Sequence, residues 1–488
     1  MPACSNWNFA ARVLARLSAR SELIDAGSGQ GFSATDLPRM ISGFAARFLA
    51  AGLHAGDRIL ISCGLDASST LAYFGAMYAG CVPTLVDQRT LGDSGHLVFA
   101  KAKAKAAWTS NRSRWDWATK NGFQQLEGVP DAASVDTVPP ASCQENDLAV
   151  LIPTSGSTGE PRLVMVSHGN LLSNTEAIIR SQRLGNDERA MLIMPVSYCF
   201  GASVVHTHLY QGGSVVFDSR FMFPDKVLRA ITTYQCTSFA GVPMVYNVLL
   251  RRSNLDSIPL PSLRRFLQAG GRLAPESVRA MRERKPGTDF FVMYGQTEAT
   301  ARISCLPPDF LSEKLGSAGL PLDNLVVRVV DECGGEVANG QTGEIQVSGP
   351  SVFLGYLDDP DATAAKFDHG WLRTGDLGYR DNDGYIWIKG RTGEFMKIRG
   401  VRVSFAEIEA RVNAIPGVCE CAATSVHHAE AGEALALFLV GDDPAQGLAE
   451  RVRYSLPPQW TCTTVRVVPE LPRTTNGKIA RSQLLSLL

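Results

Sequence analysis

The sequence predicts an α/β protein with a large N-terminal domain of parallel sheets flanked by helices, a small β-rich subdomain, and a smaller C-terminal α/β domain. Short apolar runs alternate with helical patterns up to Met293, which is typical of parallel sheets covered by helices. From Val326 the pattern changes to strands separated by turns. About 95 residues follow the turn at 390–393, which is at the low end of usual domain sizes. We therefore predict domains at residues 1–390 and 391–488.

The predicted strands are short apolar segments. In the large domain they are Arg58–Ser62, Val82–Val86, Leu148–Ile152, Ala190–Met194, Ser214–Phe217, Ser238–Ala240 and Phe290–Met293. In the β-rich subdomain they are Val326–Asp331, Gly343–Val347 and Tyr385–Ile388. The segment after His168 predicts the start of a helix, and the alternation of Ala and Lys over Ala100–Ala107 predicts a solvated helix.

Composition limits the kinds of partner that the protein can have. A chain of 488 residues with 45% hydrophobic residues is too long for one compact core of ordinary size. The 47 basic and 48 acidic residues balance, so no overall field attracts nucleic acid or an anionic membrane. The 11 scattered cysteines fit free thiols in a reducing cytosol, and no apolar run is long enough to span a membrane. We expect a cytoplasmic protein.

Residues 154–168 contain a loop rich in glycine and hydroxyl side chains. Gly156 and Gly159 allow backbone N–H groups to approach an anion closely. The hydroxyl donors are Thr154, Ser155, Ser157 and Thr158. Arg162 adds a positive charge. Since the Walker spacing is absent, this stretch alone fits either a phosphate-binding loop or an ordinary Ser/Gly-rich turn.

Four further motifs follow this loop in order along the chain. They occupy residues 293–300, 370–378, 390–400 and 472–481. With the loop, they resemble the adenylate-forming superfamily, which contains acyl- and aryl-CoA synthetases, adenylation domains of nonribosomal peptide synthetases, and luciferases. The resemblance spans most of the chain, and the joint match is far more specific than any single motif.

The resemblance implies that ATP and Mg²⁺ serve to activate a carboxylic acid as acyl-AMP, with release of pyrophosphate. Because two anions must meet, cations must converge on them. By resemblance, Lys478 is the catalytic lysine that bridges the carboxylate and the α-phosphate, and it acts electrostatically. Thr297 touches the α-phosphate, and Glu298 holds the metal. The small domain is expected to be mobile and to deliver Lys478.

The resemblance also assigns the nucleotide site. Tyr294 packs against adenine, with Gly270 and Gly271 on the other side of the base. Asp376 accepts hydrogen bonds from the ribose hydroxyls, and Arg391 adds a donor. The full predicted ATP-binding set is Thr154, Ser155, Gly156, Ser157, Thr158, Gly159, Arg162, Gly270, Gly271, Tyr294, Gly295, Gln296, Thr297, Asp376 and Arg391.

The predicted acid pocket is mostly apolar. Its residues are Tyr198, Phe200, Gly201, Ala202, Val205, Gly241 and Met293. The stretch 195–206 offers no carboxylate to pair with a substrate amine, so amino acids are disfavoured and an apolar fatty or aryl acid is expected. We interpret His206 and His208 as buried packing residues and not as a metal pair.

The chain departs from the family pattern at several positions. Arg162-Leu163 replaces a Lys-Gly pair, and a guanidinium is not interchangeable with an ammonium. Gly393 occupies the hinge position and permits a wide dihedral change. The segment around Gly400 is expected to replace Lys478 in the thiol step.

The acyl acceptor stays open at this point. Coenzyme A or the phosphopantetheine of an acyl or peptidyl carrier protein is the first hypothesis. The alternatives are an amide synthetase that uses an amine, or a catalytically silent nucleotide-binding relative.

Overall fold

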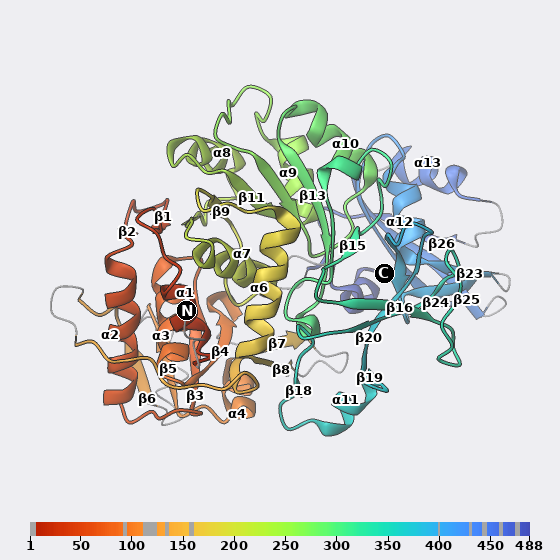
Figure 1. Ribbon diagram of the computed structural model, residues 1–488. Helices are drawn as coiled ribbons and strands as arrows, with labels where there is room; N and C mark the ends of the chain where they lie inside the picture. The colour runs from red at the N-terminus through yellow and green to blue at the C-terminus, as the bar shows by residue number, and fades with distance from the viewer. Residues whose placement is uncertain are drawn as a thin grey trace. The chain divides into compact units, whose positions relative to one another are not determined.

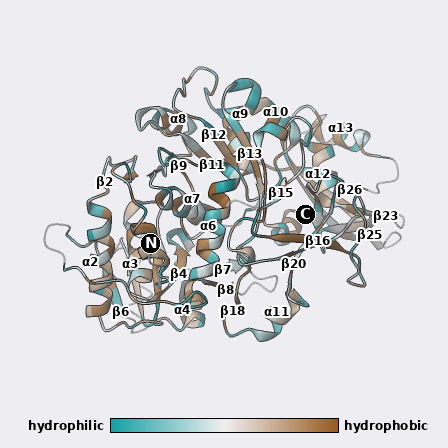
Figure 2. Ribbon diagram, viewed as in Figure 1, coloured by the Kyte–Doolittle hydropathy of each residue, from teal (hydrophilic) through white to brown (hydrophobic). Residues whose placement is uncertain are grey.

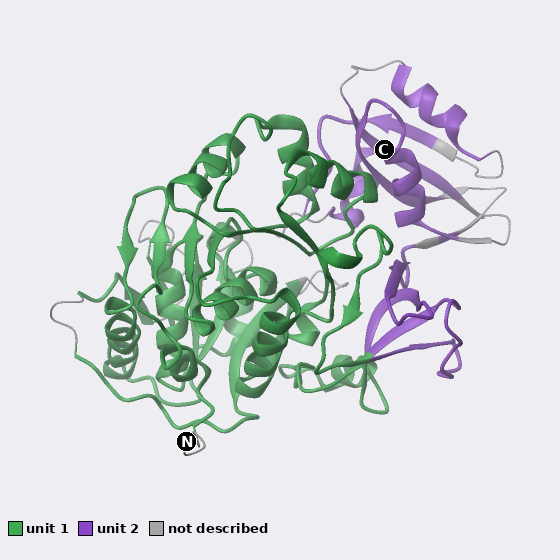
Figure 3. Cartoon of the chain, turned by 45° about the horizontal axis from the view of Figure 1, so that its top comes forward, with its two compact units in different colours: residues 1–326, 347–372 green, residues 327–346, 373–488 purple. Residues whose placement is uncertain are grey.

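A computed structural model of the chain describes residues 6–90, 95–110, 124–131, 136–155, 161–398, 401–428, 432–441, 447–457, 462–473 and 479–488. The chain divides into two compact units (Figure 3). Unit 1 comprises Met1–Val326 and Val347–Leu372, and unit 2 comprises Val327–Gln346 and Arg373–Leu488. Among the described residues, no helix has both the length and the apolar character needed to cross a membrane.

Unit 1 contains a seven-stranded sheet. Its strand order is β18 (Gly355–Tyr356), β8 (Pro161–Ser167), β7 (Leu148–Ser155), β4 (Val82–Asp87), β3 (Arg58–Cys63), β5 (Ala106–Thr109) and β6 (Gln124–Glu127). Strands β7, β4, β3, β5 and β6 pair in parallel, whereas β8 is antiparallel to β7 and β18. The helices along this part of the chain are α2 (Asp36–Ala50), α3 (Ala67–Tyr78) and α4 (Gly95–Ala102).

A nine-stranded sheet forms the second layer of unit 1. Its order is β15 (Leu320–Pro321), β14 (Ser304–Leu306), β13 (Asp289–Tyr294), β12 (Arg265–Gln268), β11 (Ser238–Gly241), β9 (Arg189–Leu192), β10 (Ser214–Phe217), β1 (Leu23–Asp25) and β2 (Gly31–Phe32). The strands from β13 to β1 are parallel, and those at both edges are antiparallel. Its helices are α8 (Pro224–Thr233), α9 (Pro243–Arg252) and α10 (Pro275–Arg284).

Helices also lie between the two large sheets (Figure 1). Helix α3 packs on β3 and β4, and α6 (His168–Gln182) packs on β7 and β8 of the same sheet. Helix α7 (Cys199–Tyr210) packs on β9 and β10 of the other sheet, and it contacts α6 and α1 (Phe9–Leu14). Every residue of α7 is buried, as expected for a helix that is largely apolar on all sides. Apolar residues dominate the strands, and polar ones mark exposed helix faces (Figure 2).

Helix α6 begins as its sequence predicts. The Ser167 hydroxyl accepts a hydrogen bond from the Asn170 N–H, and the Asn170 amide oxygen accepts one from the Ser167 N–H. This reciprocal capping satisfies two N–H groups that would otherwise lack partners at a buried helix end.

Unit 2 is built mainly from sheets. One sheet has the order β16 (Val326–Val330), β17 (Gly343–Ser348) and β20 (Trp371–Arg380), and β21 (Ile386–Arg391) also pairs with β20. The short strand β19 (Phe367–Asp368) pairs with Leu372 and Trp371, and these four residues belong to unit 1. The rest comprises β22 (Phe395–Ile398) with β23 (Val401–Ser404), and β24 (Val418–His428), β25 (Gly432–Gly441) and β26 (Cys462–Val467). Helices α12 (Phe405–Asn413) and α13 (Gly447–Ser455) share an apolar core with these strands, whose fully buried members include Ile408, Leu437 and Leu448.

Five short segments complete the elements. They are α11 (Pro360–Ala365), η1 (Gln88–Thr90), η3 (Thr297–Ala299), η4 (Pro308–Phe310) and η5 (Arg481–Leu487).

This architecture confirms the predicted α/β fold class, and each predicted strand has a counterpart. The predicted helix over Ala100–Ala107 is wrong in its second half. Helix α4 ends at Ala102, Lys103 has a positive φ of 51°, and β5 begins at Ala106. The alternating residues lie at the end of α4 and in the turn after it, and the strand Ala106–Thr109 is a fully buried run that contains no lysine.

Candidate adenylation site

The predicted phosphate loop joins two neighbouring strands. Thr154 near the end of β7 pairs with Arg162 near the start of β8, and Ser155 pairs with Pro161. The Thr154 hydroxyl lies 3.5 Å from the backbone oxygen of Arg162. Four predicted residues between these strands lie outside the described residues: Gly156, Ser157, Thr158 and Gly159. Thr154 and Arg162 therefore mark the base of this hairpin.

Arg162 and Glu298 are linked through a tyrosine that the sequence motifs did not indicate. The guanidinium carbon of Arg162 lies 5.5 Å from the ring centroid of Tyr356, and Arg162 Nε lies 3.6 Å from a carboxylate oxygen of Asp359. Tyr356 Oη donates a 2.6 Å hydrogen bond to Glu298 Oε1. Burial, and then the Glu298 charge, raise the pKa of Tyr356, so its phenol remains a donor at neutral pH. Tyr356 thus contacts both a cation of the predicted site, Arg162, and a carboxylate, Glu298.

The segment after β13 turns back sharply. Gly295 approaches the segment before β14 so closely that a Cβ atom there would lie 1.9 Å from the Ala301 carbonyl oxygen. The Ile303 N–H donates a 2.8 Å hydrogen bond to the Tyr294 carbonyl oxygen, which closes the turn. Only glycine fits this approach, and the turn places Thr297 in η3.

Thr297 contacts the start of α7. Its hydroxyl lies 3.5 Å from the Cys199 sulfur. Beside it, the side-chain nitrogen of Gln296 is buried and has no hydrogen-bond partner among the described residues. Thr297, which is predicted to touch the α-phosphate, therefore lies next to the predicted acid pocket.

The loop after β12 lies against Tyr198. Gly270 has a positive φ of 83°, and a Cβ atom there would lie 2.5 Å from Tyr198 Oη. Gln268 donates a 2.8 Å hydrogen bond to the backbone oxygen of Gly271, which holds the loop. Tyr198 and Gly270, one from the predicted pocket and one from the predicted adenine site, thus lie side by side.

The predicted acid-pocket residues are closely packed. Tyr198 and Phe200 make an edge-to-face contact with ring centroids 6.4 Å apart. A Cβ atom at Gly201 would lie 2.4 Å from the Pro195 carbonyl oxygen, so this glycine allows α7 to pack closely on the preceding segment. These three residues are buried, and so are the other four: Ala202, Val205, Gly241 and Met293.

Two histidines of α7 are confirmed as packing residues. His206 Nε2 lies 3.1 Å from Tyr73 Oη, and His208 Nε2 lies 3.0 Å from Ser238 Oγ. Burial lowers the pKa of His206 to about 3, so its ring is neutral. In the part of the chain that the structure describes, no three His, Cys, Asp or Glu side chains are grouped as a metal site.

Arg302 is the charged residue of this region that the prediction missed. Its side chain is among the largest that are fully buried, with 2% of the residue exposed. The guanidinium carbon lies 4.8 Å from the ring centroid of Phe200. Asn174 holds the Arg302 backbone through hydrogen bonds of 2.9 Å and 3.2 Å. The available signal was a single charged residue within the stretch 299–306.

The two predicted ribose residues are neighbours in unit 2. Asp376 on β20 pairs with Arg391 on β21, and Arg391 Nε donates a 3.0 Å hydrogen bond to Asp376 Oδ1. Gly393 follows with a positive φ of 91°, and a Cβ atom added there would meet no described atom within 4 Å. Gly400 and Lys478 lie outside the described residues.

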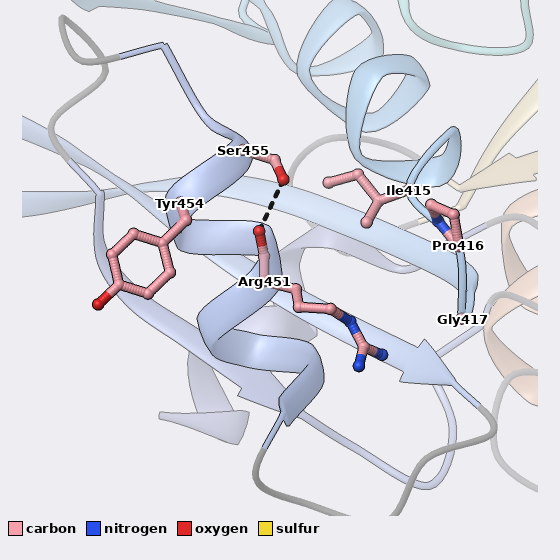
Figure 4. Close-up of a pocket in the computed structure, with 6 residues that line it drawn as sticks. All are labelled: Ile415, Pro416, Gly417, Arg451, Tyr454 and Ser455. Atoms are coloured by element: carbon pink, nitrogen blue, oxygen red, sulfur yellow. Dashed lines mark hydrogen bonds between the residues drawn. The ribbon is translucent and has the colours of Figure 1, made fainter.

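A separate hollow of about 700 Å³ lies within unit 2 (Figure 4). Its lining residues are Ile415, Pro416, Gly417, Arg451, Tyr454 and Ser455. Ser455 Oγ donates a 2.7 Å hydrogen bond to the Arg451 carbonyl oxygen inside helix α13. None of the predicted site residues lines this hollow.

Comparison with known proteins identifies related enzymes. A family model described as AMP-binding enzyme matches residues 10–357, and one described as AMP-binding enzyme C-terminal domain matches residues 407–478. A feruloyl-CoA synthase of an Amycolatopsis species is 31% identical over 492 residues, which cover 96% of this chain and 96% of that protein. A sulfoacetate–CoA ligase of Cupriavidus necator is 34% identical over 378 residues, which cover 75% of this chain and 71% of that protein. ATP-bound MatB from Rhodopseudomonas palustris has a TM-score of 0.89 and 27% identity, with 99% of each chain covered.

These likenesses agree with the sequence motifs and with the fold. The resemblance to the adenylate-forming superfamily is confirmed, and so is the prediction of an AMP-forming acid–thiol ligase of the acyl-CoA synthetase type. The chain belongs to the AMP-binding enzyme family.

Proposed function

We propose that this chain adenylates a carboxylic acid with an apolar or aromatic body and then transfers the acyl group to coenzyme A. The observation that carries this proposal is the contact between Thr297 and Cys199, because it joins the predicted α-phosphate residue to the first residue of the acid-pocket helix. The relatives named for feruloyl-CoA and sulfoacetate concern chemically different acids, so likeness alone does not fix the substrate.

The linked residues Arg162, Tyr356 and Glu298 suit the phosphate end of ATP. Glu298 offers one carboxylate, of which one oxygen accepts the Tyr356 hydrogen bond. A single carboxylate fits Mg²⁺, which takes its other ligands from phosphate and water. When bound, the metal would neutralise charge on the pyrophosphate leaving group. Arg162 would add its charge beside the same phosphates.

The predicted small domain, residues 391–488, would supply the remaining groups. Lys478 would stabilise the charge that develops between the carboxylate and the α-phosphate. Gly393 would act as the hinge, and the segment around Gly400 would serve the thiol step after rotation. Asp376 and Arg391 would hold the ribose. A carrier-protein phosphopantetheine ends in the same thiol as coenzyme A and is the alternative acceptor.

Exchange of labelled pyrophosphate into ATP tests the first half-reaction. In Lys478→Ala we expect acid-dependent exchange to fall by about 100-fold or more, because a preorganised charge at the reacting atoms is lost. ATP binding, measured by calorimetry, should persist. The matched control is Lys226→Ala, which removes an exposed lysine of α8 and should leave exchange unchanged. Full exchange in Lys478→Ala would reject the assigned role.

Product mass tests the acceptor. Incubation of one activated acid with coenzyme A should give the acyl thioester, and incubation with amines should give no amide. Amide formed at the higher rate would instead identify an amide synthetase.

A further inference from the structure

The guanidinium of Arg302 is buried, and no described carboxylate forms an ion pair with it. Its Nε atom is fully buried, and no described residue accepts a hydrogen bond from it. The groups that favour its charged form are those of Cys305, Cys199 and Tyr198. Burial raises the pKa of Cys305 to about 12 and raises that of Tyr198 as well, so both are neutral at physiological pH. Neither of these two can neutralise the arginine.

Such an arrangement is costly for a structural residue. A buried charge is normally paired and fully hydrogen-bonded, because the loss of hydration is otherwise not compensated. The cation–π contact with Phe200 offsets only part of this loss. The remaining donors of the guanidinium would be satisfied by an anion that enters the site.

The position of Arg302 connects this cation to the acid. Its guanidinium lies over Phe200, the second residue of α7, whereas Thr297 contacts Cys199, the first residue. Successive side chains of a helix point about 100° apart. The start of α7 therefore has two polar neighbours in different directions, Thr297 beside Cys199 and Arg302 over Phe200.

We propose that Arg302 binds a second anionic group of the acid, a carboxylate or a sulfonate, so that the substrate is a diacid with an apolar or aromatic body. This inference rests on the proposed adenylation function and names its substrate class. The planar fork of a guanidinium matches a carboxylate through two parallel hydrogen bonds. The aromatic rings of Tyr198 and Phe200 would cover the body between the two anionic ends.

Matched pairs of acids test the proposal. Benzoate is compared with the three benzenedicarboxylates, and hexanoate with adipate, by pyrophosphate release from the wild-type protein, Arg302→Met and Arg302→Lys. The wild type should prefer a diacid over its monoacid in kcat/KM by about 100-fold or more, because an unsatisfied buried donor penalises the analogue that lacks the acceptor. Arg302→Met should abolish this preference and leave the monoacid rate within about threefold, and Arg302→Lys should restore part of it. Arg229→Met, an exposed arginine of α8, is the matched control.

The outcomes separate two failures. If no acid of either kind releases pyrophosphate, the proposed function fails. If monoacids react as well as diacids, or if Arg302→Met lowers both equally, the function stands and the role of Arg302 is wrong. Thermal unfolding gives a readout independent of turnover. The best diacid should raise the Tm of the wild type more than that of Arg302→Met, and an equal rise in both proteins would also overturn the proposal.

Discussion

Two arginines show contrasting surroundings in the two units. Arg302 in unit 1 and Arg481 in unit 2 each lie over a phenylalanine ring, at 4.8 Å from Phe200 and 5.5 Å from Phe405. Arg481 donates hydrogen bonds of 2.6 Å and 2.9 Å to the two carboxylate oxygens of Glu409. No described carboxylate is paired with Arg302 in this way.

The comparison teaches how a structural cation differs from one held for a ligand. Burial, the largest single effect, would lower the pKa of Arg481, but the hydrogen bonds to Glu409 together with the charges of Glu409 and Glu394 outweigh it, and the pKa is raised. Glu394 lies 3.5 Å from Arg481 Nε, and the Ala423 carbonyl oxygen accepts another bond at 2.7 Å. Arg481 is thus satisfied within its own unit, whereas burial lowers the pKa of Arg302. The contrast fits a structural role for Arg481 and agrees with the ligand-binding role proposed for Arg302.

The largest loss of stability should come from breaking the ion pair between Arg481 and Glu409. We expect Arg481→Met to lower the free energy of unfolding of unit 2 by about 3 kcal/mol, because Glu409 would remain largely buried without its partner. Denaturant unfolding, followed by hydrogen exchange in peptides from α12, measures the change. Arg453→Met, at an exposed position of α13, is the control and should change stability by less than about 0.5 kcal/mol. A loss no larger than that of the control would remove the contrast between the two arginines.

Lowering the pH should destabilise the core around α7 by an amount comparable to the loss expected for Arg481→Met. His206 has a folded-state pKa of about 3, below the value of 6.5 for a free ring. Its neutral form therefore stabilises the fold above pH 6.5, and this contribution is lost as the pH falls toward 3. At pH 4 the loss is about 3 kcal/mol. Hydrogen exchange of α7 peptides should report it, and His206→Phe should flatten the dependence between pH 6.5 and 4. An unchanged slope in that variant would show that His206 is not the titrating group.

The sequence predicted the fold because its strands are apolar runs whose burial leaves little choice of structure. It missed β5, since the alternation of alanine and lysine before this strand has the composition of a helix, whereas the strand itself is the short apolar run Ala106–Thr109. The site positions taken from the order of the motifs stay predictions, and the structure pairs two of these residues, Asp376 and Arg391, on adjacent strands.

Tertiary contacts explain what the sequence did not predict. Tyr356 belongs to no recognised motif, and its hydrogen bond to Glu298 joins residues 58 positions apart in the chain. Arg302 lies just beyond a motif. The role proposed for it depends on the lack of a hydrogen-bond partner for its Nε atom among the described residues of the folded core. Such an absence cannot be read from spacing, because any of the chain's 48 acidic residues could have supplied the partner.

The smallest expected effect is the change in stability on Arg302→Met, and it tests the comparison of the two arginines directly. Without any acid present, Arg302→Met should keep or raise the free energy of unfolding, by up to about 1 kcal/mol, because an unpaired buried charge is replaced by an apolar side chain. Arg481→Met removes the same charge and shortens the side chain equally, so the two substitutions differ only in what surrounds them. When both variants are measured together in acid-free buffer, the denaturant midpoint of Arg481→Met should fall and that of Arg302→Met should stay unchanged or rise. A loss at Arg302 as large as that at Arg481 would mean that the fold depends on this guanidinium, and the cation would then belong to the core and not to a ligand.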